Sequence, residues 1–224
     1  QESAEFVVVN EAKCDNSATG NIIEGVNVEL SCEVRWQGYK RPTLQWYGPN
    51  GEVDTFPQPE DEDNPDLYVV TANMTASSNH DEVDWECRVF FEEEGQEEAP
   101  SYTDLCMSMF RVQYGPKNIV TYPDPDDTSE GKFVIDVGAA INCTAEANPL
   151  PTFSWHSEDG GHIEPTDTLY ITMEMVSEEE HVYRCEARNQ VNGVPIVRNK
   201  TVTFLVREPD PEPTTGGVEP WVIA

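Results

Sequence analysis

A cysteine–tryptophan–cysteine pattern occurs twice along this chain and restricts the fold more than any other feature. The two copies consist of Cys32, Trp46 and Cys87, and of Cys143, Trp155 and Cys185. An aromatic residue stands two positions before the second cysteine of each copy, Trp85 in the first and Tyr183 in the second. A duplicated pattern in 224 residues predicts two domains of about 100 residues, each with its own hydrophobic core.

The residues around these cysteines alternate between apolar and polar with the period of two that is typical of β-strands. In the first copy the inward set is predicted to be Val28, Leu30, Cys32, Val34 and Trp36, followed by Trp85, Cys87, Val89 and Phe91. In the second copy it is predicted to be Ala139, Ile141, Cys143 and Ala145, followed by Tyr183, Cys185 and Ala187. The predicted class is therefore all-β, and Asn142 is expected to point outward.

Short motifs in both copies resemble immunoglobulin domains. The segments DEVDWEC (81–87) and EEHVYRC (179–185) are similar to the D-x-G-x-Y-x-C signature of that superfamily, with Trp85 in place of tyrosine in the first. The segment CTAEANPLPTFSW (143–155) resembles the second domains of nectin-like and related adhesion receptors. The resemblance implies two tandem immunoglobulin-like β-sandwiches. The F-G-x-G motif of antigen-receptor joining strands is missing, which argues against an antigen-receptor variable domain.

The resemblance also implies an inter-sheet disulfide in each domain, Cys32 with Cys87 and Cys143 with Cys185. The two remaining cysteines, Cys14 and Cys106, stand where the first and last strands of domain 1 are expected. These strands are neighbours in sandwiches whose first strand crosses to the second sheet, so Cys14 with Cys106 is the preferred third bridge. Four cysteines in one domain still allow three pairings.

Disulfides and N-glycosylation sequons both predict an extracellular protein. The sequons are at Asn73, Asn142 and Asn199. A signal peptide is expected to have been removed before Gln1. The acidic, Pro- and Gly-rich stretch 208–224 is expected to be a stalk that leads to a single-pass membrane anchor after Ala224. A secreted protein with the same tail is the alternative.

The predicted domain limits are 1–115 for a variable- or intermediate-type domain and 116–207 for a compact C2- or I-type domain. Cys32 and Cys87 are 55 residues apart, which leaves room for an extra edge strand, whereas Cys143 and Cys185 are only 42 apart. The net charge of −30, from 43 acidic and 13 basic residues, makes nucleic acid a poor partner and would steer basic protein partners toward the chain. Acidic loops that interact only with water are the alternative.

No motif for catalysis or for a cofactor is found. His156 and His162 flank acidic residues, but their spacing matches no standard zinc site. The acidic runs lack the ligand spacing of a calcium loop, although a cation-dependent structural protein remains a third class. We therefore predict neither an enzyme nor a metalloprotein.

In the adhesion receptors that this chain resembles, the sheet of strands G, F and C of domain 1 is the usual recognition face. The outward residues on this sheet are predicted to be Gln45, Tyr47, Arg88, Phe90, Met107, Met109 and Arg111. Aromatic residues, methionine and arginine are enriched at interface cores. Strand G is predicted to run from Met107 to Tyr114. A bulge or a one-residue shift in this strand would instead turn the methionines inward and Phe110 and Val112 outward.

Two further segments are candidates for binding. Lys40 and Arg41 lie in the B-to-C turn, and glutamates lie in the neighbouring F-to-G hairpin. These charges either neutralise one another within one molecule or form a salt-sensitive contact between molecules. Val53-Asp54-Thr55 resembles the integrin-binding loop of addressins and vascular adhesion molecules, whose aspartate ligates the metal ion of the integrin. An ordinary acidic turn is the alternative for Asp54.

From these features we predict a cell-surface ectodomain in adhesion or receptor signalling that binds a protein partner, homophilic or heterophilic, mainly through domain 1. A homodimer through domain 1 is included in this prediction. The alternative is a secreted or surface immune-type molecule that binds microbial or soluble ligands. No cofactor is expected, and membrane contact is expected only through the anchor.

Overall fold

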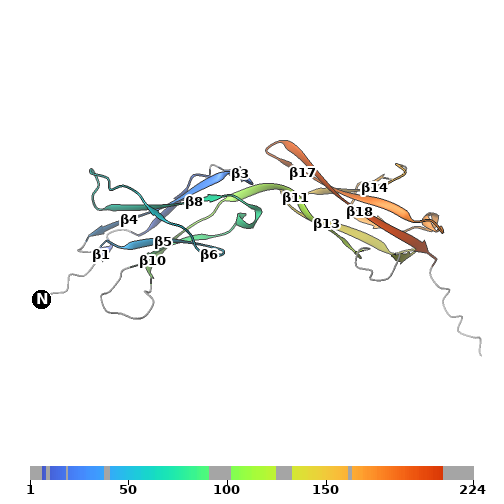
Figure 1. Ribbon diagram of the computed structural model, residues 1–224, viewed down its shortest axis with the longest axis horizontal. Coiled ribbons are helices and arrows are strands. Elements are labelled where there is room, and N and C mark those ends of the chain that lie inside the picture. The colour runs from blue at the N-terminus through green and yellow to red at the C-terminus, as the bar shows by residue number, and fades with distance from the viewer. Residues whose placement is uncertain are drawn as a thin grey trace, which may run out of the picture. The chain divides into compact units, whose positions relative to one another are not determined.

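The computed structural model describes residues 7–8, 11–18, 20–37, 41–90, 102–124, 133–160 and 163–208. Contacts between residues divide the chain into two units. The first comprises Gln1–Tyr114 with Val191–Val194, and the second comprises Gly115–Gln190 with Pro195–Ala224. We call these units domain 1 and domain 2, and both are β-sandwiches (Figure 1).

Domain 1 is built of two packed sheets. The first contains β1 (Val7–Val8), β4 (Asn27–Gln37), β8 (Leu67–Thr75) and β7 (Phe56–Pro57) in that order, with β2 (Lys13–Asn16) also paired to β4. The second contains β10 (Tyr102–Ser108), β9 (Trp85–Phe90), β5 (Thr43–Gly48) and β6 (Gly51–Glu52). A short 3-10 helix, η1 (Ser78–His80), precedes β9.

Domain 2 repeats the two-sheet plan. One sheet has β13 (Ala140–Asn148) between β16 (Thr168–Tyr170) and β11 (Arg111–Tyr122). The other contains β12 (Val134–Asp136), β18 (Val194–Arg207), β17 (His181–Val191), β14 (Thr152–Ser157) and β15 (Ile163–Glu164) in that order. The 3-10 helix η3 (Met173–Met175) follows β16.

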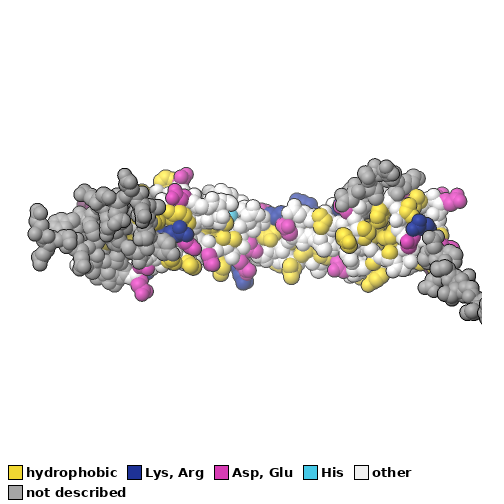
Figure 2. Space-filling view, turned by 90° about the horizontal axis from the view of Figure 1, so that it is seen from below, with side chains coloured by type: hydrophobic (Ala, Val, Ile, Leu, Met, Phe, Trp, Pro, Cys, Tyr) yellow, Lys and Arg dark blue, Asp and Glu magenta, His cyan; other side chains and the backbone are white. Residues whose placement is uncertain are grey.

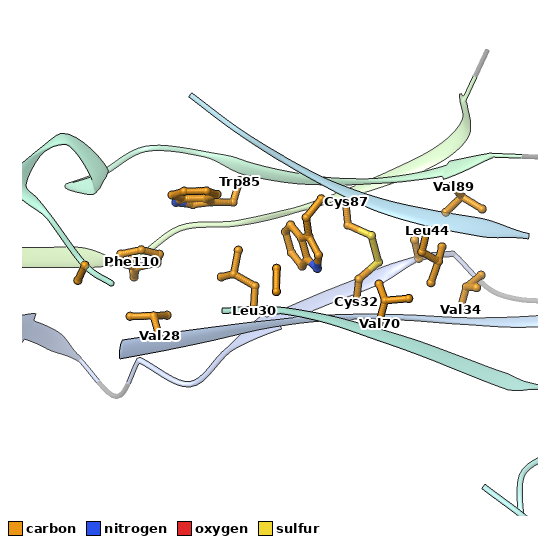
Figure 3. Packing of buried hydrophobic residues seen from close by; sticks show 14 of the residues in the cluster. Val28, Leu30, Cys32, Val34, Leu44, Val70, Trp85, Cys87, Val89 and Phe110 are labelled. Carbon is orange, nitrogen blue, oxygen red and sulfur yellow. A yellow bond between two sulfur atoms is a disulfide. The ribbon is translucent and has the colours of Figure 1, made fainter. Parts of the chain in front are cut away.

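The predicted alternation is present in both domains. In β4, Val28, Leu30, Cys32 and Val34 are buried, whereas Trp36 at the end of the strand is half-buried. In β9, Trp85, Cys87 and Val89 are buried, and Phe91 lies outside the described residues. These side chains surround the Cys32–Cys87 disulfide between the sheets (Figure 3).

The last strand of domain 1 differs from the prediction of one strand from Met107 to Tyr114. It is broken at Met109–Phe110, which belong to neither β10 nor β11. Ser108 pairs with Trp85, the first residue of β9, so the residues after Ser108 have no β9 partner. The chain instead pairs with β3 (Asn21–Ile23), which runs parallel to β11 from Arg111 onward.

All six cysteines form disulfides. The bridges are Cys14–Cys106, Cys32–Cys87 and Cys143–Cys185, so the third bridge is the pairing that the sequence analysis preferred. In domain 1 the two bridges lie side by side, because Cys14 pairs with Cys32 across β2 and β4 and Cys106 pairs with Cys87 across β10 and β9. The Sγ atoms of Cys32 and Cys106 are 3.8 Å apart.

Among the described residues, no helix is long and apolar enough to cross a bilayer. The predicted stalk lies outside the described residues from position 209 onward.

Candidate functional site

One surface of domain 1 collects most of the predicted binding residues: the outer side of the sheet β10–β9–β5–β6. We call it the β5–β9–β10 face and define it by seven outward side chains. These are Gln45, Tyr47, Glu86, Arg88, Phe90, Leu105 and Met107. They point outward because they alternate with the buried residues of the three strands.

Strand register arranges these side chains in rows across the sheet. Arg88 of β9 pairs with Gln45 of β5 on one side and with Leu105 of β10 on the other. Glu86 pairs in the same way with Tyr47 and Met107. Directly opposed side chains on one sheet face have Cβ atoms about 5 Å apart, so each row forms one continuous surface.

Arg88 is the centre of this surface. Its Nε and Nη2 donate hydrogen bonds to Glu86 Oε2 at 3.0 and 2.7 Å. Its guanidinium carbon lies 4.2 Å from the centroid of the Tyr47 ring, in a cation–π contact. Because the charges of Arg88 and Glu86 cancel locally, the centre of the face is close to neutral in a chain of net charge −30. Figure 2 shows how acidic side chains are spread over one side of the described surface, with hydrophobic side chains between them.

Tyr47 is also held by the neighbouring edge strand. Its hydroxyl donates to Glu52 Oε1 of β6 at 3.2 Å. Burial raises the pKa of the Tyr47 phenol above its ordinary value of 10.0, and the hydrogen bond and charge of Glu52 raise it further, against the opposing charge of Arg88. The phenol therefore stays protonated at neutral pH. Phe90 stands beside it, with the ring centroids 6.4 Å apart.

Gln45 does not present a free amide to a partner. Its Nε2 donates to the Val53 carbonyl at 2.6 Å and lies 3.1 Å from both the Trp46 carbonyl and the Thr55 hydroxyl. The residue therefore holds the segment after β6 against β5. We assign Gln45 to the support of the face and not to its contact surface.

The two methionines of the predicted face are exposed. Met107 is 54% and Met109 51% exposed, whereas Phe110 and Val112 are buried. The alternative with a shifted strand is therefore wrong. Arg111 also points outward, but it lies beyond the end of β9 and forms an ion pair with Glu82 at 2.7 Å. Met109 and Arg111 thus extend the surface along the chain without joining the rows around Arg88.

Sequence reasoning missed Leu105 and Glu86 as members of the face. The last strand was predicted to begin at Met107, so Leu105 fell in front of it. The period of two already present in Met107 and Met109, extended backward by one step, identifies Leu105. The alternation of β9 places Glu86 on the same side as Arg88, but the ion pair between them depends on side-chain packing.

The other candidate loops are described only in part. Lys40 and the acidic F-to-G hairpin lie outside the described residues. Arg41 forms an ion pair with Glu60 at 3.2 Å and stacks on the Tyr68 ring at 4.5 Å, so the structure gives it a partner within domain 1. Asp54 is exposed between β6 and β7.

The three sequon asparagines, Asn73, Asn142 and Asn199, are all exposed. Asn73 lies on β8, in the sheet opposite to the β5–β9–β10 face. In domain 2, His156 Nε2 forms a hydrogen bond with the Ser154 hydroxyl at 2.9 Å, and His162 lies outside the described residues. Within the described part of the chain, the one cluster with metal-ligand geometry is Cys14, Cys32 and Cys106, which are all in disulfides.

Comparisons with known proteins support the fold. Residues 138–198 match the family model of the immunoglobulin domain. The full ectodomain of mouse nectin-like molecule 4 is similar over 92% of this chain and 67% of that chain, with 19% identity and a TM-score of 0.60. A titin fragment matches over 92% of this chain and 100% of that chain with 16% identity, but its TM-score of 0.38 is too low to support the fold. No curated protein sequence matches this chain.

Proposed function

We propose that this protein, whose two domains have the immunoglobulin fold, acts in cell adhesion or receptor signalling by binding a protein partner through the β5–β9–β10 face of domain 1. The role is recognition without catalysis. Three disulfides and the absence of free cysteines fit an extracellular or cell-surface location.

The observation that carries this proposal is the contiguous group Tyr47, Arg88, Phe90 and Met107 on one outer sheet face. Tyrosine and arginine are enriched among residues that dominate binding energy. Arg88 is already oriented by Glu86 and Tyr47, so little side-chain entropy remains to be lost when a partner binds.

The sequons support the same assignment. A glycan on Asn73 would cover the opposite sheet of domain 1 and leave the β5–β9–β10 face open. Glycans on Asn142 and Asn199 would both lie on domain 2, which then serves as a glycosylated spacer.

The net charge of −30 favours a heterophilic partner with a basic surface. Two copies of this chain repel each other at long range, whereas a basic partner is attracted to the chain and associates with it faster. A homophilic contact would have to rely on the neutral centre around Arg88.

The test uses a double variant that carries both Arg88→Glu and Phe90→Ser. The control variant is Glu29→Lys, on the opposite sheet. Beads that carry the full chain are mixed with one another and with cells that each express one surface protein. We expect the double variant to lose at least about tenfold in affinity, since it removes an arginine and an aromatic anchor. The control should bind normally, and circular dichroism should show all variants folded. Equal binding by the double variant and the wild type would rule out this face.

A further inference from the structure

Domain 2 carries an apolar strip on the outer side of the sheet β16–β13–β11. Val120 and Tyr122 on β11 are 52% and 78% exposed, and Tyr170 on β16 is 61% exposed. Large exposed apolar side chains that gather on one face generally mark a surface that something covers. The strip is unusual in a chain of mean hydropathy −0.55.

Asn142 lies in the middle of this strip. It is on β13, which stands between β16 and β11 in the sheet, and it points outward because Ile141 and Cys143 are buried. On the β16 side, Asn142 pairs with Thr168 and Ala140 pairs with Tyr170. Tyr170 is therefore the diagonal neighbour of Asn142, at a Cα separation of about 7–8 Å.

On the other side of Asn142 in the sheet lies β11, which ends at Tyr122. Asn118 of β11 donates to Glu146 of β13 at 3.1 Å. The corresponding strands of domain 1, β2 and β4, pair antiparallel. We take β11 to run antiparallel to β13 in the same way, with the register that the contact between Asn118 and Glu146 suggests. The proposal then places Tyr122, four residues after Asn118, beside Asn142, four residues before Glu146.

We infer that an N-linked glycan on Asn142 is the cover of this strip, with its first sugar packed between Tyr122 and Tyr170. The sequon is Asn142-Cys143-Thr144. In the modification, Asn142 Nδ2 forms a bond to the anomeric carbon of an N-acetylglucosamine. The bond from that carbon to the diphosphate of a lipid-linked oligosaccharide breaks, the lipid diphosphate leaves, and Nδ2 gives up one proton.

The chemistry of the sugar suits the strip. One side of a pyranose ring presents aliphatic C–H groups that pack on aromatic rings by dispersion and by removal of apolar surface from water. The hydroxyl groups on the other side remain in water. The Thr168 hydroxyl lies 2.8 Å from Asn142 Oδ1 and 3.0 Å from Asp167 Oδ1, and it has one hydrogen to donate. When it donates to Asn142, it orients the amide at the attachment point.

Asn199 offers a control within the same domain. It lies on β18, in the other sheet, and the next residue, Lys200, is engaged in an ion pair with Asp124 at 2.8 Å. The substitution Thr201→Ala removes this sequon, and Thr144→Ala removes that of Asn142. Both threonines are exposed, so the two substitutions disturb the core equally little.

The experiment uses the full chain secreted from glycosylating cells, with mass spectrometry to establish that Asn142 carries sugar. Hydrogen exchange is then measured on peptides that cover β13 and β16. We expect Thr144→Ala to accelerate exchange there about fivefold, on the scale of one aromatic packing contact, and Thr201→Ala to leave it unchanged. A glycosidase that leaves a single N-acetylglucosamine should preserve the slow exchange, because the first sugar makes the contacts.

The decisive arm combines Tyr122→Ser and Tyr170→Ser with and without Thr144→Ala. The serine pair should accelerate exchange about fivefold in the glycosylated protein and less than about twofold in the unglycosylated one. If a variant fails to fold, enzymatic removal of the glycan from the folded wild type supplies the same comparison.

An unoccupied Asn142 would overturn the proposal. An equal effect of the serine pair with and without sugar would also overturn it, and would assign the strip to a second copy or to another protein.

Discussion

The two domains share one cysteine framework, yet they fill the space around it differently. Two positions before the second cysteine, domain 1 has Trp85 and domain 2 has Tyr183. The Trp85 ring lies over Gly48, where a Cβ atom would stand 2.8 Å from Trp85 Cε3. In domain 2 the residue paired with Tyr183 is Ser157. A larger ring is thus accommodated by the loss of a side chain on the neighbouring strand.

The contacts of the Trp85 and Tyr183 rings also differ between the two domains. Trp85 stacks on Phe110 with ring centroids 6.1 Å apart (Figure 3). The ring centroid of His80 lies 5.1 Å from that of Trp85, with the two ring planes nearly perpendicular. Within the described part of the chain, its buried Nε1 has no hydrogen-bond partner. Trp85 therefore stabilises domain 1 by packing. In many immunoglobulin domains a tyrosine at this position donates a hydrogen bond to the backbone, and among the described residues Trp85 Nε1 makes no such bond. Tyr183 stacks on Phe204 at 5.7 Å.

Removal of disulfides should give the largest difference in stability loss between the two domains. Replacement of Cys143 and Cys185 by alanine removes the one bridge of domain 2 and should cost about 4 kcal/mol, enough to unfold a domain of marginal stability. Replacement of Cys14 and Cys106 leaves Cys32–Cys87 between the same two sheets. That variant should stay folded, with faster hydrogen exchange in β2 and β10. Global unfolding of domain 1 in it would show that the two bridges are not redundant.

The fit between Gly48 and Trp85 gives the next largest effect. Gly48→Ala should destabilise domain 1 by about 2 kcal/mol, because the new methyl group overlaps the indole ring in a packed core. Trp85→Tyr should recover part of this loss in the double variant, which denaturant unfolding can measure. Asn50→Ala, at an exposed turn of the same hairpin, is the control. Strictly additive losses would contradict the proposed size compensation.

Ion pairs provide a smaller contrast. The Lys200 and Asp124 side chains of domain 2 are only 20% and 27% exposed, and Lys200→Met should cost about 1 kcal/mol. In domain 1, Lys13 lies 3.8 Å from Glu33 and both are well exposed, so Lys13→Met should cost less than about 0.5 kcal/mol. Thermal unfolding in low and high salt checks both values, and equal losses would remove the distinction.

The smallest predicted effect is a pH dependence confined to domain 1. Burial against Trp85 lowers the pKa of His80 below its ordinary value of 6.5. The unfolded chain therefore binds the proton more tightly than the folded domain. The contribution of neutral His80 to the stability of domain 1 is complete above pH 6.5 and is lost as the pH falls toward the folded pKa. His80→Gln should flatten the loss of stability just below pH 6.5, as followed by hydrogen exchange in β9. An unchanged slope would mean that other groups cause it.

Much of the fold was readable from the sequence because β-strands with one buried face impose a period of two. Val28, Leu30 and Cys32 on β4 and Trp85, Cys87 and Val89 on β9 are buried as predicted. The outward direction of Tyr47, Arg88 and Met107 follows from the same periodicity. Their role in binding remains a prediction.

Other features of the candidate site had no local signal. The break at Met109–Phe110 arises because β9 begins at Trp85 and offers no partner beyond Ser108. The engagement of Gln45 with Val53 and Thr55 depends on how the segment after β6 folds back. Both facts depend on contacts between different segments of the chain, and a periodic pattern within one strand does not describe such contacts.

The sequence by itself determined two all-β domains, the strand faces around each inter-sheet disulfide and the candidate residues of one sheet. These follow from local periodicity and from the cysteine count. Only the tertiary structure decided that Cys14 joins Cys106 beside Cys32–Cys87, that Arg88 is held by Glu86 and Tyr47, and that Tyr170 flanks Asn142. The physical reason is that register and sheet order set which strands meet, and contacts between side chains exist only after the strands have met.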